Sequence, residues 1–227
     1  MNRDKQGRPK ALISWSSGKD SAFALLEVLE RDEIDVVGAL TTVTSAYGRV
    51  SMHGVREELL DLQVAQLGLP CYKVHIPSPC PDEVYEREME RMLERVRQLG
   101  VTHMIFGDLF LEDIRAYRES QLARAGFEAV FPLWGRPTPV LAEQMLARGL
   151  SARLTCVDPR RLGPSFAGRR YDAELLGDLP ADVDPCGERG EFHTFCNRCP
   201  EFNREISVQV GEIVERDGFW FADLHRC

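Results

Sequence analysis

A run of small polar residues near the start of the chain, Ser16-Ser-Gly-Lys-Asp-Ser21, has the residue types that bind a polyphosphate. It offers three hydroxyls, a lysine cation and a glycine that lets an anion approach the backbone. An apolar strand predicted at residues 11–15 precedes the run, and a helix predicted at residues 20–30 follows it. The first N–H groups and the positive dipole end of such a helix attract anions. The spacing is not that of a Walker A loop, because Ile13 stands where a glycine is required and Asp20 follows the lysine. A phosphate loop of another class is predicted; a capped helix start that binds nothing is the alternative.

A second group of chemically active residues lies nearer the C-terminus, in Asp184-Pro-Cys-Gly-Glu-Arg-Gly-Glu-Phe-His-Thr-Phe195. Glu188, Glu191 and His193 are close enough in sequence to share one pocket. They have the chemistry of general acids and bases, or of ligands for a hard cation. A polar turn that leads into a strand is the alternative interpretation.

The cysteines allow a third kind of chemistry. Cys196-x-x-Cys199 can be a redox dithiol or half of a zinc site, with Cys186 and His193 as candidate partners. The chain has seven cysteines and no export signal, so reduced thiols are expected instead of a disulfide framework.

Alternating apolar and amphipathic segments predict the elements that position these groups. Strands are expected at residues 11–15, 36–43, 70–76, 101–108 and 128–134, and helices at residues 20–30, 52–67, 82–99 and 139–148. A loop and a helix are expected within residues 109–125. This alternation predicts an α/β fold with a doubly wound, mostly parallel sheet. Gly107 and Asp108 end the fourth strand and are expected near the phosphate loop, because ligands bind at the carboxyl edge of such sheets.

The pattern changes after residue 149. A strand is expected at residues 150–157, and a hairpin at residues 206–224 turns at Asp217-Gly218. We therefore predict a nucleotide-binding domain at residues 1–149 and a smaller C-terminal α+β substrate domain at residues 150–227.

Composition limits the classes of function. The chain has 227 residues, 44% hydrophobic and 28% charged, with a net charge of -8, which disfavours nucleic-acid binding. No stretch approaches a membrane span, and residues 1–10 have the composition of a polar tail, not of a signal peptide. A cytoplasmic protein is expected.

The phosphate loop, residues 16–21, resembles the PP-loop of the ATP pyrophosphatase family, whose usual form begins Ser-Gly-Gly. These enzymes cleave ATP between the α and β phosphates and activate a substrate by adenylation. Ser17 stands where the first glycine is common, so we expect its backbone to avoid positive φ. The resemblance implies that ATP is held by Ser16, Ser17, Gly18, Lys19, Asp20 and Ser21, and that backbone groups around Leu40 and Thr41 hold the adenine.

Three further motifs resemble the diphthine-ammonia ligase branch of this family and its short prokaryotic relatives: Phe106-Gly-Asp-Leu-Phe-Leu-Glu-Asp-Ile-Arg115, Phe131-Pro-Leu-Trp-Gly-Arg136 and Glu188-Arg-Gly-Glu-Phe-His-Thr-Phe195. Enzymes of this branch adenylate a carboxylate on a modified histidine of elongation factor 2, and ammonia then displaces AMP. The resemblance implies that Gly107 and Asp108 close the nucleotide pocket, and that the acceptor site is shaped by Glu188, Gly190, Glu191, His193 and Thr194. Arg189 and Cys196-Asn-Arg-Cys-Pro-Glu201 depart from the family pattern, so the acceptor pocket is expected to differ.

The resulting hypothesis is an ATP-dependent ligase that adenylates a carboxylate, releases pyrophosphate and forms an amide with ammonia or an amine. Its cofactors are ATP and Mg²⁺, with Asp20 or Asp108 as the metal ligands. Its partners are ammonia and a small-molecule or protein carboxylate, and a homodimer is left open. The predicted catalytic residues are Lys19, Asp20, Glu188, Glu191 and His193, and substrate contacts are expected from Glu112, Arg115, Gly190 and Thr194.

Two other functions are kept open. One is a PP-loop sulfurtransferase that uses Cys196 and Cys199, and the other is an adenine-nucleotide sensor without catalysis. His53 and Arg56, at the start of a predicted helix, are further candidates to reach a phosphate or a substrate carboxylate, although a solvent-facing pair is the more common case.

Overall fold

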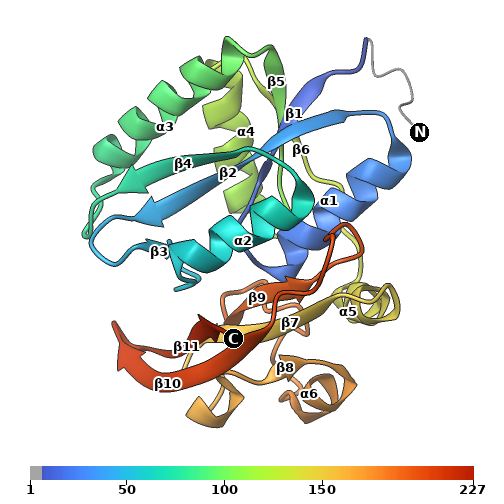
Figure 1. Cartoon of the computed structure of the whole chain (residues 1–227), viewed down its shortest axis with the longest axis vertical. Coiled ribbons are helices and arrows are strands. Elements are labelled where there is room, and N and C mark those ends of the chain that lie inside the picture. Colours follow the sequence, from blue (N-terminus) through green and yellow to red (C-terminus); the bar gives the residue numbers. More distant parts are fainter. Residues whose placement is uncertain (1–6) are drawn as a thin grey trace.

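A mostly parallel sheet forms the N-terminal half of the computed structural model, which describes residues 7–227. Residues 1–6 of the expected polar tail lie outside this range. β1 (Lys10–Ser14) lies between β2 (Asp35–Thr44) and β5 (Val101–Ile105) and is parallel to both. β4 (Cys71–Ile76) extends the sheet beyond β2, and β6 (Glu128–Val130) extends it beyond β5, again in parallel. The predicted doubly wound α/β fold is confirmed (Figure 1).

Helices cover both faces of this sheet. Successive side chains of a strand point to opposite faces, so alternate residues pack against different helices. Ala11 and Ile13 of β1 belong to the core cluster that includes α1 (Lys19–Arg31) and α2 (Glu57–Leu67). Leu12 belongs to a second cluster with α3 (Asp82–Arg97) and α4 (Glu112–Arg124). All three β1 residues have 0% exposure, which explains the uninterrupted apolar run in the sequence.

An antiparallel sheet makes up most of the C-terminal part. Its strands are β7 (Ser151–Val157), β8 (Arg170–Tyr171), β9 (Phe192–Arg198), β10 (Val208–Arg216) and β11 (Phe219–Arg226). β7 pairs with β8, β9 and β11. α5 (Thr138–Ala147), a short 3-10 helix (Pro164–Phe166) and α6 (Ala173–Asp178) accompany the sheet. The predicted terminal hairpin is confirmed, with positive φ at Asp217 and Gly218 in its turn.

Three predicted element boundaries are wrong by three residues or more. β5 ends at Ile105 instead of residue 108, so Gly107 and Asp108 follow the strand instead of ending it. α2 begins at Glu57 instead of residue 52, because β3 (Arg49–Val50) pairs antiparallel with β2 and a turn with positive φ at Met52 and Gly54 follows it. β6 ends at Val130 instead of residue 134. Pro132 lacks the N–H group that a ladder requires.

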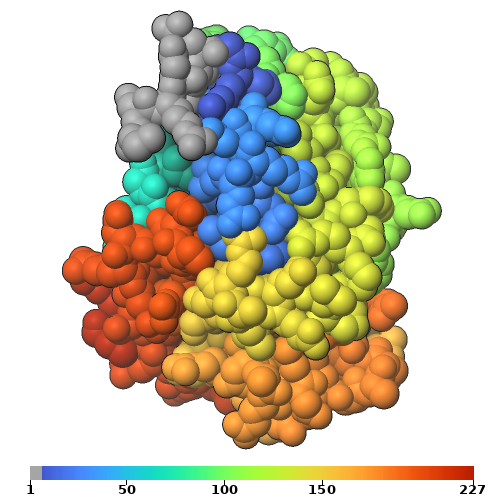
Figure 2. Space-filling model, turned by 90° about the vertical axis from the view of Figure 1, so that its right-hand side faces the viewer, coloured from blue at the N-terminus to red at the C-terminus, as the bar shows by residue number. Residues whose placement is uncertain are grey.

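The two halves share one core. The cluster around α1 continues into the C-terminal sheet through Leu154 and Phe195. On the face in Figure 2, the blue α1 region is bordered directly by yellow and by red segments of later sequence. The boundary predicted between residues 149 and 150 remains a prediction. Within residues 7–227, no helix has the length and apolarity needed to cross a membrane.

Candidate functional site

The phosphate loop joins the carboxyl end of β1 to the start of α1, as predicted. The Gly18 N–H donates to Ser16 Oγ at 3.3 Å, and Ser21 Oγ donates to the Gly18 carbonyl at 3.0 Å. A Cβ at Gly18 would lie 3.3 Å from Ser16, His53 and Thr194 side-chain atoms. Polar groups from three parts of the chain thus converge on this glycine.

The backbone of Ser17 differs from the prediction. Its φ is 70°, in the left-handed region that was expected to be avoided. This conformation costs a non-glycine residue about 1–2 kcal/mol. The Ser17 carbonyl accepts the N–H of Cys196 at 2.8 Å and the side-chain amide of Gln63 at 3.0 Å, and these bonds hold it in place. Ser17 Oγ is buried and has no hydrogen-bond partner within residues 7–227, so it could form a hydrogen bond to a ligand of the loop.

β9 attaches the C-terminal segment directly to this loop. The N–H of Lys19 donates to Thr194 Oγ1 at 3.1 Å, and the neighbouring Cys196 holds Ser17 as described. Gln63 also donates to the Cys196 carbonyl at 2.6 Å. Residues 16–21 and residues 192–196 therefore form one rigid unit, although they lie far apart in the sequence.

A cavity of ≈ 800 Å³, here called the nucleotide cavity, opens beside the phosphate loop. Six predicted site residues line it: Ser16, Leu40, Thr41, Glu188, Gly190 and His193. Its volume is within the range of about 300–1,000 Å³ that is usual for small-molecule sites. The cavity thus has walls from both predicted parts of the site.

The carboxyl group of Glu188 lies on the wall of the nucleotide cavity and is suited to proton transfer. Its carboxylate accepts the N–H of Leu109 at 2.7 Å, just beyond the end of β5. Burial raises the pKa of Glu188 to about 7, and the negative charges of Asp20 and Asp108 add to this shift, although backbone N–H groups oppose it. A carboxyl group with this pKa exchanges a proton readily at neutral pH.

Lys19 is almost completely buried at the start of α1. Its ammonium group donates to both carboxylate oxygens of Asp20 at 3.0 Å and to the carbonyl of Cys186. Burial is the largest single influence and lowers the pKa of Lys19, but the combined attraction of Asp20, Cys186 and Glu188 exceeds it and the net shift is upward. Burial raises the pKa of Asp20 in spite of the nearby lysine. The Lys19 side chain is therefore protonated at neutral pH.

Two imidazoles meet at the edge of the nucleotide cavity. The rings of His53 and His193 lie 4.4 Å apart between centroids. Burial and the Lys19 charge lower the pKa of His193 to about 4, and burial and His193 lower the pKa of His53 well below its usual value. Both rings are neutral at pH 7 and available as hydrogen-bonding groups.

Glu191 holds the loop that carries Glu188. Its buried carboxylate accepts the N–H groups of Asp184 at 3.0 Å and Arg189 at 2.9 Å. Asp184 in turn accepts the N–H of Cys186 at 2.8 Å and the hydroxyl of Thr138 at 2.6 Å. These contacts support a positioning role for Glu191, and its predicted role in proton transfer remains untested.

Gly107 lies beside the start of α1, as the parallel-sheet argument predicted, but neither Gly107 nor Asp108 lines the nucleotide cavity. A Cβ at Gly107 would come within 2.8 Å of the Asp20 carbonyl carbon. Asp108 forms an ion pair with Arg118 at 3.1 Å, and Arg118 lines the nucleotide cavity. The structure does not bring Glu112 and Arg115 into this cavity. Arg115 packs over the rings of Phe131 and Trp134 instead, so that Arg118, one turn later on α4, faces the cavity.

The sequence analysis missed Gln63 and gave too little weight to His53. Gln63 is a fully buried amide that joins the side chain of Trp15, the phosphate loop and β9. A polar residue on the apolar face of a predicted helix was the available signal. Arg56 does not reach the nucleotide cavity, because it pairs with Asp223 of β11 at 2.6 Å.

The close approach of Gly107 to α1 gives a test. We expect Gly107→Ala to destabilise the fold by about 1–3 kcal/mol, the usual cost of overpacking, and to weaken ATP binding because the start of α1 must move. Denaturant unfolding and ATP titration measure both effects. Gly177→Ala in α6 is the control, since its new methyl group would meet nothing within 4 Å. Parent-like unfolding and ATP binding of Gly107→Ala would contradict the close packing.

A doubly wound sheet with this loop at the carboxyl end of its first strand, and a cavity beside it, defines the ATP-binding PP-loop class. Family models identify the branch: the diphthamide synthase N-terminal domain matches residues 9–129, and the diphthamide synthase C-terminal domain matches residues 138–226. The chain belongs to the diphthamide synthase family, which confirms the resemblance seen in the sequence.

Curated relatives agree with this assignment. The chain is 27% identical to the diphthine–ammonia ligase of Danio rerio, over 92% of this chain and 90% of that protein. It is 26% identical to the proteins of the same name from Bos taurus and Homo sapiens, in both cases over 96% of this chain and 88% of the relative. These relatives support an ATP-dependent ligase activity at the level of the family.

Proposed function

We propose that the protein is an ATP-dependent, AMP-forming amide ligase. In the first step an acceptor carboxylate oxygen attacks the α phosphorus of ATP, and pyrophosphate leaves. In the second step ammonia or an amine attacks the acyl carbon of the adenylate, AMP leaves with the former carboxylate oxygen, and the nitrogen loses a proton. The observation that carries this proposal is the nucleotide cavity, which places Ser16 of the phosphate loop and Glu188 of the C-terminal loop on the walls of one space.

The roles follow from the contacts. Residues 16–21 would hold the phosphates of ATP through N–H groups and hydroxyls, and the strand end at Leu40 and Thr41 would hold the adenine. Lys19 would offset the negative charge that develops as pyrophosphate leaves. Glu188 would take the proton lost by the attacking nitrogen, since its pKa of about 7 suits a base at neutral pH. His193 would donate or accept a hydrogen bond to the acceptor, with Gly190 and Thr194 beside it.

A magnesium ion is consistent with the carboxylates of this site. Mg²⁺ is commonly bound by one or two protein carboxylates together with substrate phosphates, and Asp20 and Asp108 are the candidates. When bound, the ion would neutralise phosphate charge. Residues 7–227 contain no cluster of three or more acidic, histidine or cysteine side chains arranged to hold a metal by itself. This also leaves the Cys186, Cys196, Cys199 and His193 set without support as a zinc site.

The relatives are named for diphthine and ammonia as substrates. We propose the same reaction class here, with a carboxylate acceptor bound by the region of residues 150–227 and ATP bound by residues 1–149.

The sulfurtransferase alternative is disfavoured by the burial and the raised pKa of its two thiols. Cys196 and Cys199 are buried, and burial raises the pKa of Cys196 well above its usual value and that of Cys199 to about 11. A sulfur carrier requires an accessible thiolate.

Product identity tests the proposal. We expect AMP and pyrophosphate to form in equal amounts when ATP, a carboxylic acid and an ammonium salt are all present, together with one amide per AMP. Omission of the acid or of ammonium should prevent amide formation. Bound but uncleaved ATP in every mixture would instead identify a nucleotide sensor, and a product that contains sulfur from a persulfide donor would identify a sulfurtransferase.

A further inference from the structure

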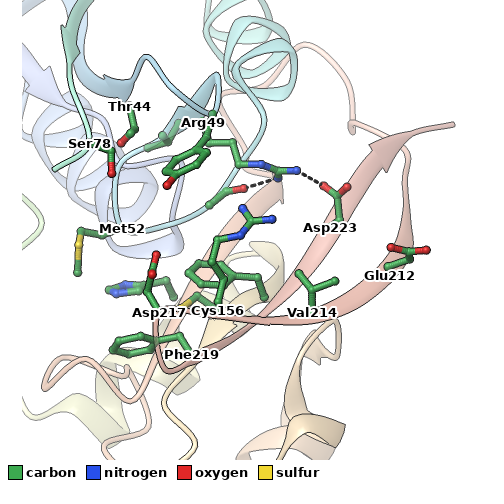
Figure 3. Close-up of a pocket in the computed structure, with 16 residues that line it drawn as sticks. Thr44, Arg49, Met52, Ser78, Cys156, Glu212, Val214, Asp217, Phe219 and Asp223 are labelled. Carbon is green, nitrogen blue, oxygen red and sulfur yellow. Dashed lines mark hydrogen bonds and ion pairs between the residues drawn. The ribbon is translucent and has the colours of Figure 1, made fainter.

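A second cavity adjoins the first. This hairpin pocket, of ≈ 330 Å³, lies between the β2–β3 region and the β10–β11 hairpin. Figure 3 shows Thr44, Arg49 and Met52 on one side and Val214, Asp217 and Phe219 on the other. Its volume is at the small end of the range of about 300–1,000 Å³ for ligand sites. Nothing in the proposed nucleotide-binding role uses this pocket.

The hairpin pocket adjoins the nucleotide cavity. Val50, Met52 and His193 line both spaces, so these three residues form the junction at which the two spaces meet. His193 comes from β9, the strand that is bound to the phosphate loop through Thr194. A molecule in the hairpin pocket would therefore have one end close to the nucleotide.

The inner wall of the hairpin pocket is mostly apolar. Val50, Val214, Phe219 and Phe221 provide its hydrocarbon surface. Its Asp223 carboxylate is paired with Arg49 at 2.9 Å (Figure 3), and Glu212 and Asp217 bring two further carboxylates to the lining. Apolar walls favour an uncharged, apolar body, and the lining carboxylates disfavour a second carboxylate on the ligand.

Residues from both halves of the chain meet at this pocket. Arg216, from the end of β10, lies over the ring of Tyr47 at 5.6 Å, and both residues line the pocket. Gly54 is packed so closely that a Cβ there would lie 2.7 Å from the ring of Phe221. A pocket of ≈ 330 Å³ is of a size that suits a small free molecule.

We propose that the hairpin pocket holds the apolar body of a small free carboxylic acid, whose carboxylate passes the Val50, Met52 and His193 junction to reach the nucleotide. This inference rests on the proposed ligase function and adds its acceptor class. Apolar monocarboxylic acids are the preferred acceptors, and dicarboxylic acids of similar length are poor ones.

Substitutions on one strand test the pocket. Val214 lines it, whereas the adjacent Ile213 is 42% exposed and does not. Val214→Trp should fill the pocket and raise the KM for 3-phenylpropanoate at least 10-fold, with the KM for ATP unchanged. Ile213→Trp is the matched control and should behave like the parent. Val214→Ala should shift the preference towards bulkier acids, so the test stands even if Val214→Trp folds poorly.

Two measurements separate this inference from the proposed function. Calorimetry with a non-cleavable ATP analogue present should detect binding of 3-phenylpropanoate to the parent and at least 10-fold weaker binding to Val214→Trp. In assays with the parent, 3-phenylpropanoate should exceed glutarate at least 10-fold in kcat/KM. Amide formation that prefers dicarboxylates, uses only a protein acceptor or is insensitive to Val214 would overturn the hairpin-pocket assignment and leave the ligase intact. Absence of AMP with every acceptor would overturn both.

Discussion

Replacement of Lys19 by methionine is expected to lower the rate of AMP formation by at least about 100-fold, the usual effect of removing one group that stabilises developing negative charge. Methionine keeps the unbranched shape of the side chain but has no charge. Lys19 is the first residue of α1, and its ammonium is fixed by Asp20 and the Cys186 carbonyl before any substrate binds. A cation fixed in this way does not have to be reorganised as pyrophosphate leaves.

Loss of stability has to be separated from loss of catalysis. The side chain of Asp20 is 26% exposed, so water can solvate it in the variant, and the cost should be below the roughly 3–5 kcal/mol of breaking a fully buried ion pair. Thermal unfolding measures this cost. Lys73→Met is the control, because Lys73 also forms an ion pair, with Glu57 at 2.8 Å, but lies on β4 and pairs with residues of α2 instead of the phosphate loop. Equal AMP yields from Lys19→Met and the parent would exclude the proposed role of the loop.

Local sequence patterns were sufficient to predict the sheet and the phosphate loop. Apolar runs such as Ala11, Leu12 and Ile13 identify strands that are buried on both faces, and strand–helix alternation then fixes a parallel sheet. The same reasoning placed Gly107 beside the start of α1. It failed at Met52, because a turn with positive φ is determined by the β2–β3 pairing and not by helical periodicity.

The relative positions of the two parts of the site could not be derived from local patterns. The left-handed Ser17 is stabilised by donors from Gln63 and Cys196, which are far away in the sequence. The ring contact between His53 and His193 and the hairpin pocket likewise depend on how β9 and β10 pack against the first half. In the sequence, Glu188 and Glu191 are equally good candidates for proton transfer. Their contacts in the structure distinguish them, because Glu191 holds the loop through the Asp184 N–H and Glu188 lines the nucleotide cavity.

Glu188→Gln is expected to lower kcat by about 100- to 10,000-fold, the range for general acid–base catalysis, and to remove a pH dependence. In the parent, activity should rise with pH through an inflection near 7, because only the ionised Glu188 accepts a proton. Rates of amide formation between pH 5.5 and 9, with saturating ATP and ammonium held constant as free ammonia, give the profile.

The ionisation of Glu188 should raise activity but lower the stability of the folded protein as pH rises. Its pKa in the folded state, about 7, is above its ordinary value of 4.5, so between these values the folded protein binds more protons than the unfolded chain. Stability therefore falls as pH rises through this window, and the loss is complete above pH 7. Glutamine imitates the protonated form, so the variant should gain stability relative to the parent between pH 5 and pH 8. Thermal unfolding at several pH values measures the difference.

Two further variants determine whether the carboxylate of Glu188 itself is responsible. Glu90→Gln changes another carboxylate on the wall of the nucleotide cavity and should preserve the inflection near 7. Glu191→Gln loses one acceptor for the N–H groups of Asp184 and Arg189, so it should lower stability while its activity profile keeps the same inflection. An inflection that survives in Glu188→Gln but disappears in Glu191→Gln would transfer the proton-accepting role to Glu191. The positioning role argued from its buried hydrogen bonds would then be wrong.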